Sequence, residues 1–137
     1  MFWRIPPVYK HMDKNIKTKG YAATDTSGKL SPYEFERRPV GDNDILIDIK
    51  YASICHSDIH QARDEWGGSI FPMVPGHEIV GVAVQIGSDV TKFKEGDTVG
   101  VGCFVDSCRT CMSCKDGLEQ YCEEGMVFTY NGLDKEG

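Results

Sequence analysis

The sequence predicts a mainly β domain with short helices, in which a metal site rather than an apolar core holds the C-terminal part. Short apolar runs of strand length are separated by turns that contain glycine and aspartate. Beyond Phe104 the chain becomes polar, and four cysteines fall within 15 residues there. With 137 residues, 40% of them apolar, the chain is long enough for one domain with a core.

The N-terminal stretch and the overall charge limit the partners and the location. Residues 1–16 show neither strand nor helix periodicity, so we expect an extension outside the fold and a domain over residues 17–137. The first 20 residues contain two adjacent prolines and four lysines instead of an apolar run, which argues against a secretory signal and favours a cytoplasmic location. The apolar runs are too short to cross a membrane. The net charge of −6, without a basic face, excludes nucleic acid as a partner.

Three strands and one helix can be placed from local patterns. The first strand shows alternation, and the apolar residues that share its buried face are Ile45, Ile47, Ile49 and Tyr51. The second strand is predicted over residues 79–86 and the third over residues 98–105, each beside a turn with glycine and aspartate. A short helix is predicted over residues 57–63 with Ser57 as its N-cap.

The most specific pattern is Cys-x2-Cys-x2-Cys-x7-Cys, formed by Cys108, Cys111, Cys114 and Cys122. Zinc bound by four sulfurs would neutralise half the charge of four thiolates and close a loop with little apolar content. The x2 spacings suit knuckle turns in which backbone N–H groups point at sulfur. Two disulfides, an iron–sulfur cluster and free thiols are the alternatives, of which disulfides conflict with a cytosolic context. Cys103 lies in an apolar strand pattern, so we expect a small buried core residue there.

A second group of potential ligands stands at the ends of the first two predicted strands. Cys55 and His56 follow one strand, and His77 and Glu78 begin the next. A cysteine and a histidine together suit zinc, although an open site needs a third protein ligand. Taken singly, Cys55 could fill a strand, His77 could be a hydrogen-bonded core residue and Glu78 a surface charge. Spacing alone leaves both interpretations open.

The ordered series of motifs closely resembles zinc-dependent medium-chain alcohol dehydrogenases over about residues 18–130. The motifs are Tyr51-Ala-Ser-Ile-Cys55-His56-Ser57-Asp58-Ile-His60, Trp66-Gly67, Phe71-Pro-Met-Val-Pro75-Gly76-His77-Glu78-Ile-Val-Gly81, Gly96-Asp97-Thr-Val-Gly-Val-Gly102-Cys103 and the four-cysteine run. Within this family the chain looks most like the cinnamyl-alcohol type of NADP-preferring aldehyde reductase. The resemblance implies a GroES-like, partly open β-barrel that serves hydride transfer between NADP(H) and a primary alcohol or aldehyde.

The resemblance also implies two zinc sites. Structural zinc would be held by the four lobe cysteines Cys108, Cys111, Cys114 and Cys122. Catalytic zinc would be held by Cys55 and His77, with Glu78 behind the metal or transiently on it. Asp58 would accept a hydrogen bond from the ligating imidazole and so orient it.

The remaining roles implied by the resemblance concern protons, cofactor and substrate. Ser57 would take the alcohol proton and pass it to His60, which reaches solvent. His56, with Ser57 beside it, would contact the cofactor, and Trp66 would wall the substrate pocket. Apart from the resemblance, Ser57 has an alternative role as a helix cap, and His60 could be an ordinary exposed residue.

The family's Rossmann domain and the third cysteine ligand of its catalytic zinc are expected to lie beyond Gly137. The nearest approach to a Gly-x-Gly-x-x-Gly fingerprint has Val105 in the third place and no helix after it. We therefore expect the isolated chain to hold about one zinc tightly, to bind no NADP(H), to reduce no aldehyde and to form homo-oligomers through its exposed cleft. Two other functions stay open, a stand-alone non-catalytic zinc module and a thiol redox sensor.

Overall fold

The structure is a computed structural model that describes residues 15–133. Most of the predicted N-terminal extension lies outside the described residues, but Ile16, its last residue, is already the first residue of β1. The strands are β1 (Ile16–Ala23), β2 (Leu30–Arg37), β3 (Ile45–Ser53), β4 (Glu78–Ile86), β5 (Thr98–Val101), β6 (Phe104–Asp106) and β7 (Val127–Phe128). The helices are α1 (His56–Ala62), α2 (Met112–Lys115) and a 3-10 turn, Glu119–Tyr121.

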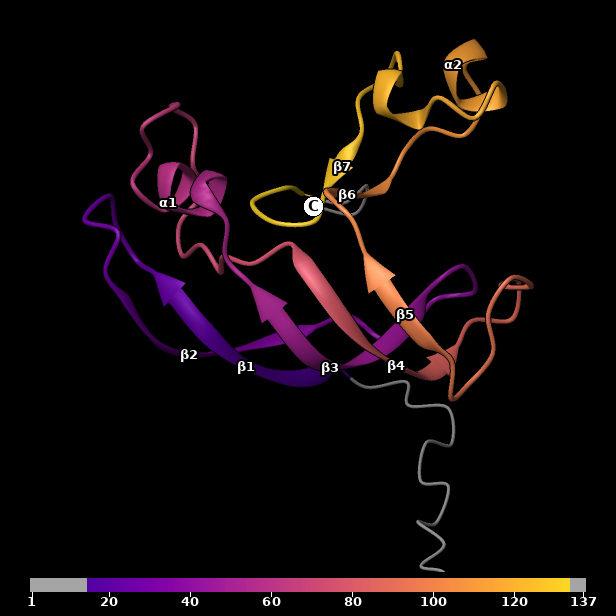
Figure 1. The fold of residues 1–137 in the computed structure, drawn as a ribbon, viewed down its shortest axis with the longest axis horizontal. Coiled ribbons are helices and arrows are strands. Elements are labelled where there is room, and N and C mark those ends of the chain that lie inside the picture. Colours follow the sequence, from indigo (N-terminus) through magenta and orange to yellow (C-terminus); the bar gives the residue numbers. More distant parts are fainter. Residues whose placement is uncertain (1–14, 134–137) are drawn as a thin grey trace, which may run out of the picture.

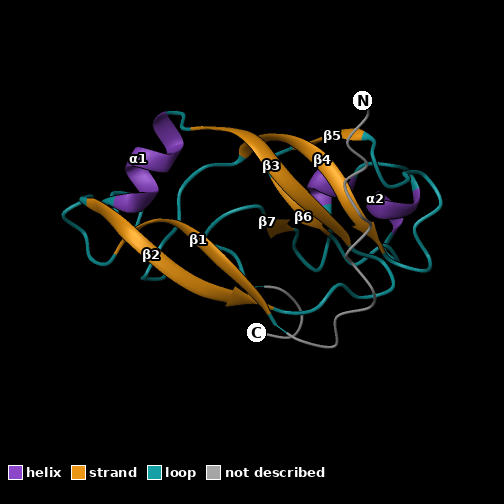
Figure 2. Ribbon diagram, turned by 90° about the horizontal axis from the view of Figure 1, so that it is seen from below, coloured by secondary structure: helices purple, strands orange, loops and turns teal. Residues whose placement is uncertain are grey.

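The strands form three antiparallel sheets, β1-β2, β3-β4-β5 and β6-β7. Figure 1 shows the first two sheets side by side, with α1 beyond one end of β3 and the lobe that carries α2 standing away from the sheets. Figure 2 shows the same sheets from below, with β6 and β7 behind them. The mainly β fold class with short helices and open sheets is confirmed. No helix of residues 15–133 is long and apolar enough to cross a membrane.

The pairing of β3 with β4 decides where the site residues meet. Ser53, the last residue of β3, lies opposite Glu78, the first residue of β4. Antiparallel pairing therefore brings the residues after β3 close to those before β4. Gly81 permits this close pairing, because a Cβ there would lie 2.5 Å from the Ile47 side chain and 2.6 Å from the Asp48 carbonyl oxygen.

One face of β3 differs from the sequence prediction. Ile49 and Tyr51 were expected on a buried face, but they are 53% and 75% exposed. The strand itself forms as predicted. Residues 15–133 cover only part of these two side chains, so an apolar stretch of the β3-β4-β5 sheet remains open to solvent.

The predicted third strand is divided in two. β5 ends at Val101, and β6 begins at Phe104 in a different sheet. Thr129 fixes this break, because its side chain donates to the carbonyl oxygen of Gly102 and its backbone N–H donates to the carbonyl oxygen of Cys103 over 3.1 Å. The expectation that Cys103 is a buried core residue is therefore wrong, since the side chain is exposed at this turn.

A small apolar cluster connects the elements around the site. Ala23, Ala62 and Met73 are its buried members, and Tyr130 packs against them. Ala23 and Met73 also exchange two backbone hydrogen bonds of 2.8 Å each. The cluster thus fixes the end of β1, the helix α1 and the segment before β4 relative to one another.

Candidate metal centres

The first candidate centre lies where the end of β3 is paired with the start of β4. Cys55 follows β3 and is the N-cap of α1, and His77 directly precedes β4. The Cys55 Sγ and His77 Nε2 atoms are 3.6 Å apart. Sulfur and nitrogen ligands at their usual distances from one tetrahedral zinc would also be about 3.6 Å apart. The spacing of these two atoms therefore fits zinc.

Glu78 completes this cluster. One ligand atom each from Cys55, His77 and Glu78 lies within 4.8 Å of the other two. Ser53 donates a hydrogen bond from its hydroxyl to the Glu78 carboxylate, which ties that side chain to the end of β3. Soft sulfur, imidazole and carboxylate form a donor set that zinc accepts.

Asp58 holds the cluster from behind. Its side chain is buried, and its carboxylate accepts hydrogen bonds from the backbone N–H of Cys55 over 2.9 Å and of Gly76 over 2.8 Å. The same carboxylate lies 3.2 Å from His77 Nδ1. A proton on Nδ1 shared with Asp58 leaves the Nε2 lone pair toward Cys55, as a metal ligand requires. Asp58 thus sets the position of both candidate ligands.

Asp58 also explains why the predicted N-cap is wrong. Ser57 was expected to cap the helix, but Cys55 occupies that position and Ser57 is already within α1. The Asp58 side chain reaches back to the Cys55 N–H, as the third residue of a capping box does. The Ser57 hydroxyl is thereby free to lie 2.8 Å from the Cys55 sulfur.

The exposed side of α1 carries the other predicted residues. The His56 and His60 rings lie 4.8 Å apart, and Trp66 lies 5.0 Å from His60, measured between ring centroids. Glu65 accepts a hydrogen bond from His60 Nδ1, which lowers the pKa of the glutamate. In the described part of the chain no hydrogen bond joins Ser57 to His60, so the predicted relay is not connected in this structure.

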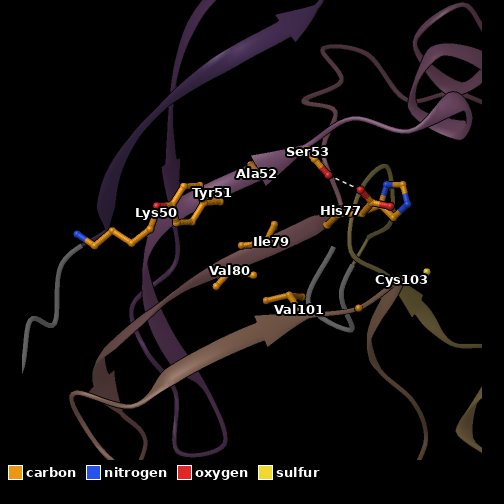
Figure 3. Close-up of a pocket in the computed structure, with 11 residues that line it drawn as sticks. Lys50, Tyr51, Ala52, Ser53, His77, Ile79, Val80, Val101 and Cys103 are labelled. Carbon is orange, nitrogen blue, oxygen red and sulfur yellow. Dashed lines mark hydrogen bonds between the residues drawn. The ribbon is translucent and has the colours of Figure 1, made fainter.

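An open groove runs from this centre along the β3-β4-β5 sheet. It has a volume of about 730 Å³, and its walls include His77 and Glu78 at one end and Tyr51 and Val80 farther along. Figure 3 shows Ser53 and His77 at that end, with Cys103 across the groove. Trp66, the predicted wall of the substrate pocket, does not line this groove.

The second candidate centre is the four-cysteine lobe. The sulfurs of Cys108, Cys111, Cys114 and Cys122 all lie within 4.8 Å of one another, and all are free thiols. The sulfurs of Cys108 and Cys114 are 3.9 Å apart, close to the edge of about 3.8 Å expected for a zinc tetrahedron. Backbone N–H groups of Thr110 and Cys111 point at the Cys108 sulfur over 3.4 and 3.3 Å. The knuckle geometry expected from the x2 spacing is present.

Two of these thiols have shifted pKa values. Hydrogen bonds from the Thr110 side chain and from the backbone N–H groups of Cys111 and Thr110 lower the pKa of Cys108 to about 6. For Cys114 the Ser107 hydrogen bond lowers the pKa, but burial and the neighbouring thiols of Cys111 and Cys122 together raise it to about 11. Without metal, the lobe is therefore only partly ionised near neutral pH.

The zinc affinity of the lobe is expected to rise with pH. Only thiolates bind zinc, and between pH 7 and 8 Cys114 must lose its proton on binding whereas Cys108 has already lost it. The one proton released from Cys114 makes the apparent affinity rise about tenfold per pH unit. Competition with a chelator at several pH values measures this slope. An affinity that does not change across this interval would show that the thiols are ionised before zinc arrives.

Sequence reasoning missed three residues that contact the predicted site residues or the segment beside them. The Tyr130 ring lies 4.7 Å from the His77 ring, and the neighbouring Asn131 side chain accepts a hydrogen bond from the backbone N–H of Ile70 over 2.8 Å. These contacts bring the segment after the lobe back to the first centre. The third residue is Glu65, the partner of His60. None of the three belongs to a spaced motif, so only the folded structure reveals them.

Comparison with known proteins decides the family. Residues 41–137 match the family described as alcohol dehydrogenase GroES-like domain. The chain belongs to this family. The GroES-like fold expected from the motif series is thereby confirmed, and Cys55, His77, Glu78 and the lobe all lie within the matched residues of this GroES-like domain.

The relatives of this GroES-like domain are dehydrogenases. A probable cinnamyl alcohol dehydrogenase 3 of Oryza sativa is 57% identical over 118 residues, which are 86% of this chain and 32% of the relative. An NADP-dependent alcohol dehydrogenase C 1 of Mycolicibacterium smegmatis is 58% identical over 118 residues, 85% of this chain and 34% of the relative. The chain spans about a third of the length of these curated relatives.

Solved structures agree with this assignment. A cinnamyl alcohol dehydrogenase of Sorghum bicolor is 54% identical with a TM-score of 0.84, and the match covers 88% of this chain and 34% of the solved chain. A cinnamyl alcohol dehydrogenase of Helicobacter pylori, complexed with NADP(H), is 50% identical with a TM-score of 0.85 over 90% of this chain and 35% of the other. Fold and sequence comparisons therefore find relatives of the same kind.

Proposed function

We propose that the chain is the zinc-binding catalytic domain of a dehydrogenase that transfers hydride between NADP(H) and a primary alcohol or aldehyde. The observation that carries this proposal is the cluster of Cys55, His77 and Glu78, held from behind by the buried Asp58. The names of the relatives, cinnamyl alcohol dehydrogenase and NADP-dependent alcohol dehydrogenase, support the choice of substrate and cofactor. The whole activity needs the dinucleotide-binding part found in full-length members of the family.

In the proposed centre, the chain's own residues hold and orient the metal. The Cys55 thiolate and His77 Nε2 would be ligands, with Glu78 in reach of the same ion. Bound zinc supplies Lewis acidity, which lowers the pKa of the alcohol oxygen or polarises the aldehyde carbonyl. Asp58 keeps the His77 imidazole in the tautomer that ligation requires.

In this proposal residues on the exposed face of α1 transfer the proton and contact the cofactor. Ser57, beside the Cys55 sulfur, would receive the alcohol proton, and His60 would carry it to solvent, although no hydrogen bond joins these two side chains in this structure. Glu65 holds His60 by its Nδ1 atom, so Nε2 is the atom left for proton exchange. His56 would meet the cofactor pyrophosphate. Trp66 would wall the substrate pocket, supported by its exposed ring beside His60.

We also place the protein in the cytoplasm in this proposal. Support comes from the thiols, because all six cysteines are free and four of them converge on one zinc-sized site. Such a site persists where thiols stay reduced. The structural zinc would fix the lobe, since that part of the chain contains little buried apolar surface.

A chimaera tests the proposed function. Residues 15–133 would replace the corresponding segment of the Sorghum bicolor enzyme, which then supplies the dinucleotide-binding part. The expected result is NADPH-dependent reduction of cinnamaldehyde, which is measured as the loss of NADPH absorbance at 340 nm. The same chimaera with Cys55→Ser should lose this activity by at least about a hundredfold, because a metal ligand is removed.

Controls separate the alternatives. Cys103→Ser should leave the chimaera active, because this thiol lies outside both ligand clusters. A folded, zinc-loaded chimaera without activity would favour the non-catalytic zinc module. Reversible release of zinc by mild peroxide, with a coupled change in partner binding, would favour the redox sensor.

We further expect the isolated chain to self-associate. Ile49, Tyr51 and Val80 are exposed apolar residues on the same sheet, and burying them in a homo-oligomer removes this surface from water. Size-exclusion chromatography with light scattering should show a dimer or larger species that Tyr51→Lys shifts toward the monomer. Tyr121→Lys on the lobe is the matched control, since Tyr121 is 68% exposed but lies outside this sheet. Equal masses of the parent chain and Tyr51→Lys would contradict this expectation.

A further inference from the structure

We propose that the exposed face of α1 is a third metal site, one that takes a borderline divalent transition metal such as Ni²⁺, Cu²⁺ or Zn²⁺ on His56 and His60. The two histidines are four residues apart in one helix and therefore lie on the same face. The same i, i+4 spacing presents the two zinc-binding histidines of His-Glu-x-x-His helices. This pair is separate from the Cys55 cluster and from the lobe.

The ring geometry fits one ion. The His56 and His60 centroids lie 4.8 Å apart. Two imidazoles that bind one ion through nitrogen at about 2.05 Å, with bond angles between 90° and 109°, have centroids roughly 4.5 to 5.2 Å apart. The observed centroid separation falls within this interval, so the two rings are close enough to share one ion.

The Glu65 carboxylate orients one of the two ligands, His60. Glu65 accepts the hydrogen bond from His60 Nδ1, which leaves Nε2 for the metal. Metal-binding histidines almost always have such a partner on the second nitrogen. The Glu65 carboxylate, held against His60, would also partly offset the charge of a bound cation. Arg63 Nη1 lies 3.7 Å from the same carboxylate, and its positive charge acts against a bound cation.

The pair is accessible. His56 is exposed, and the His60 side chain keeps 33% of its surface in solvent. With two protein ligands, water fills the remaining positions, so the site binds more weakly than the four-cysteine lobe. A cation here would occupy the imidazoles assigned above to proton transfer and cofactor contact, and would therefore inhibit. This inhibition rests on the proposed function, whereas the binding does not.

Trp66 provides a direct readout, because its ring lies 5.0 Å from that of His60. In a Trp3→Phe background, Trp66 is the sole tryptophan of the 137-residue chain. Titration of the zinc-loaded chain with Ni²⁺ should quench its fluorescence saturably. His56→Asn and His60→Asn should each weaken the apparent affinity at least about tenfold, and Glu65→Gln should weaken it severalfold.

A matched control uses His11, the fourth histidine of the sequence. His11→Asn should leave the Ni²⁺ titration unchanged, and circular dichroism confirms that each variant is folded. The proposal is overturned if no saturable quenching occurs up to millimolar Ni²⁺, or if His56→Asn and His60→Asn titrate like the parent chain. No substrate or cofactor is present in this experiment. An inactive chimaera would therefore refute the proposed function and leave the metal site standing.

Discussion

Replacing Cys108 by serine should release one zinc per chain and unfold the lobe. Cys108 accepts two backbone N–H contacts in addition to supplying a sulfur, so the substitution removes a ligand and disrupts the first knuckle. The lobe has almost no apolar core to replace the metal, since Met112 and Tyr121 are 64% and 68% exposed. Structural zinc contributes roughly 10–16 kcal/mol of apparent binding free energy in small zinc-dependent folds, and that free energy is folding free energy.

Native mass spectrometry and limited proteolysis measure the two parts of this prediction. In native mass spectrometry, the Cys108→Ser variant should lack the tightly held zinc. Trypsin should cut this variant rapidly after Arg109 and Lys115. Cys103→Ser is the matched control, because it removes an exposed thiol that belongs to neither cluster. Cys55→Ser should also keep the tightly held ion. A lobe that stays protected in Cys108→Ser would mean that zinc does not hold it.

Replacing Asp58 by alanine should cost roughly 3 to 5 kcal/mol of unfolding free energy. Two partly buried backbone N–H groups and the buried His77 imidazole then lose their acceptor, and an unsatisfied buried donor costs about 1–3 kcal/mol. This loss is a large part of the 5–15 kcal/mol that stabilises a typical domain. Asp58→Asn keeps one acceptor oxygen and should fall between alanine and the parent.

Urea denaturation of the zinc-loaded chains measures these differences. The matched control is Asp48→Ala, which removes an exposed aspartate that is paired with Lys50 and should change the unfolding free energy by less than about 1 kcal/mol. If Asp58→Ala unfolded at the same urea concentration as Asp48→Ala, the buried hydrogen bonds of Asp58 would not be holding the site together.

Local periodicity predicted the elements near the site but not their surroundings. The alternation from Ile45 to Tyr51 predicted β3 correctly, because side chains on a strand alternate whatever covers them. It could not show that Ile49 and Tyr51 stay exposed, since exposure depends on residues distant in sequence. β2 contains Pro32, which weakens a strand pattern, and its pairing with β1 was not predicted.

For the site residues too, local patterns predicted some features, whereas others depend on residues distant in sequence. Regular spacing revealed the lobe, because knuckle turns need their cysteines at fixed intervals. The approach of Cys55 to His77 follows from strand pairing, and only resemblance to a family indicated it beforehand. The exposure of Cys103 depends on hydrogen bonds from Thr129, 26 residues later, which no local pattern encodes. Ser57 is a better N-cap by residue type than Cys55, yet the side chain of Asp58 decided the cap.

The short β6-β7 pair has a consequence for how this fold can change. Asp106 lies opposite Val127, so the chain leaves for the lobe and returns from it at neighbouring points. An insertion with adjacent ends can grow, shrink or be exchanged without pulling on its surroundings. The contacts of Tyr130 with His77 and of Asn131 with Ile70 lie after this return point. The lobe can therefore be altered or exchanged, in evolution or by design, without changing the geometry around His77.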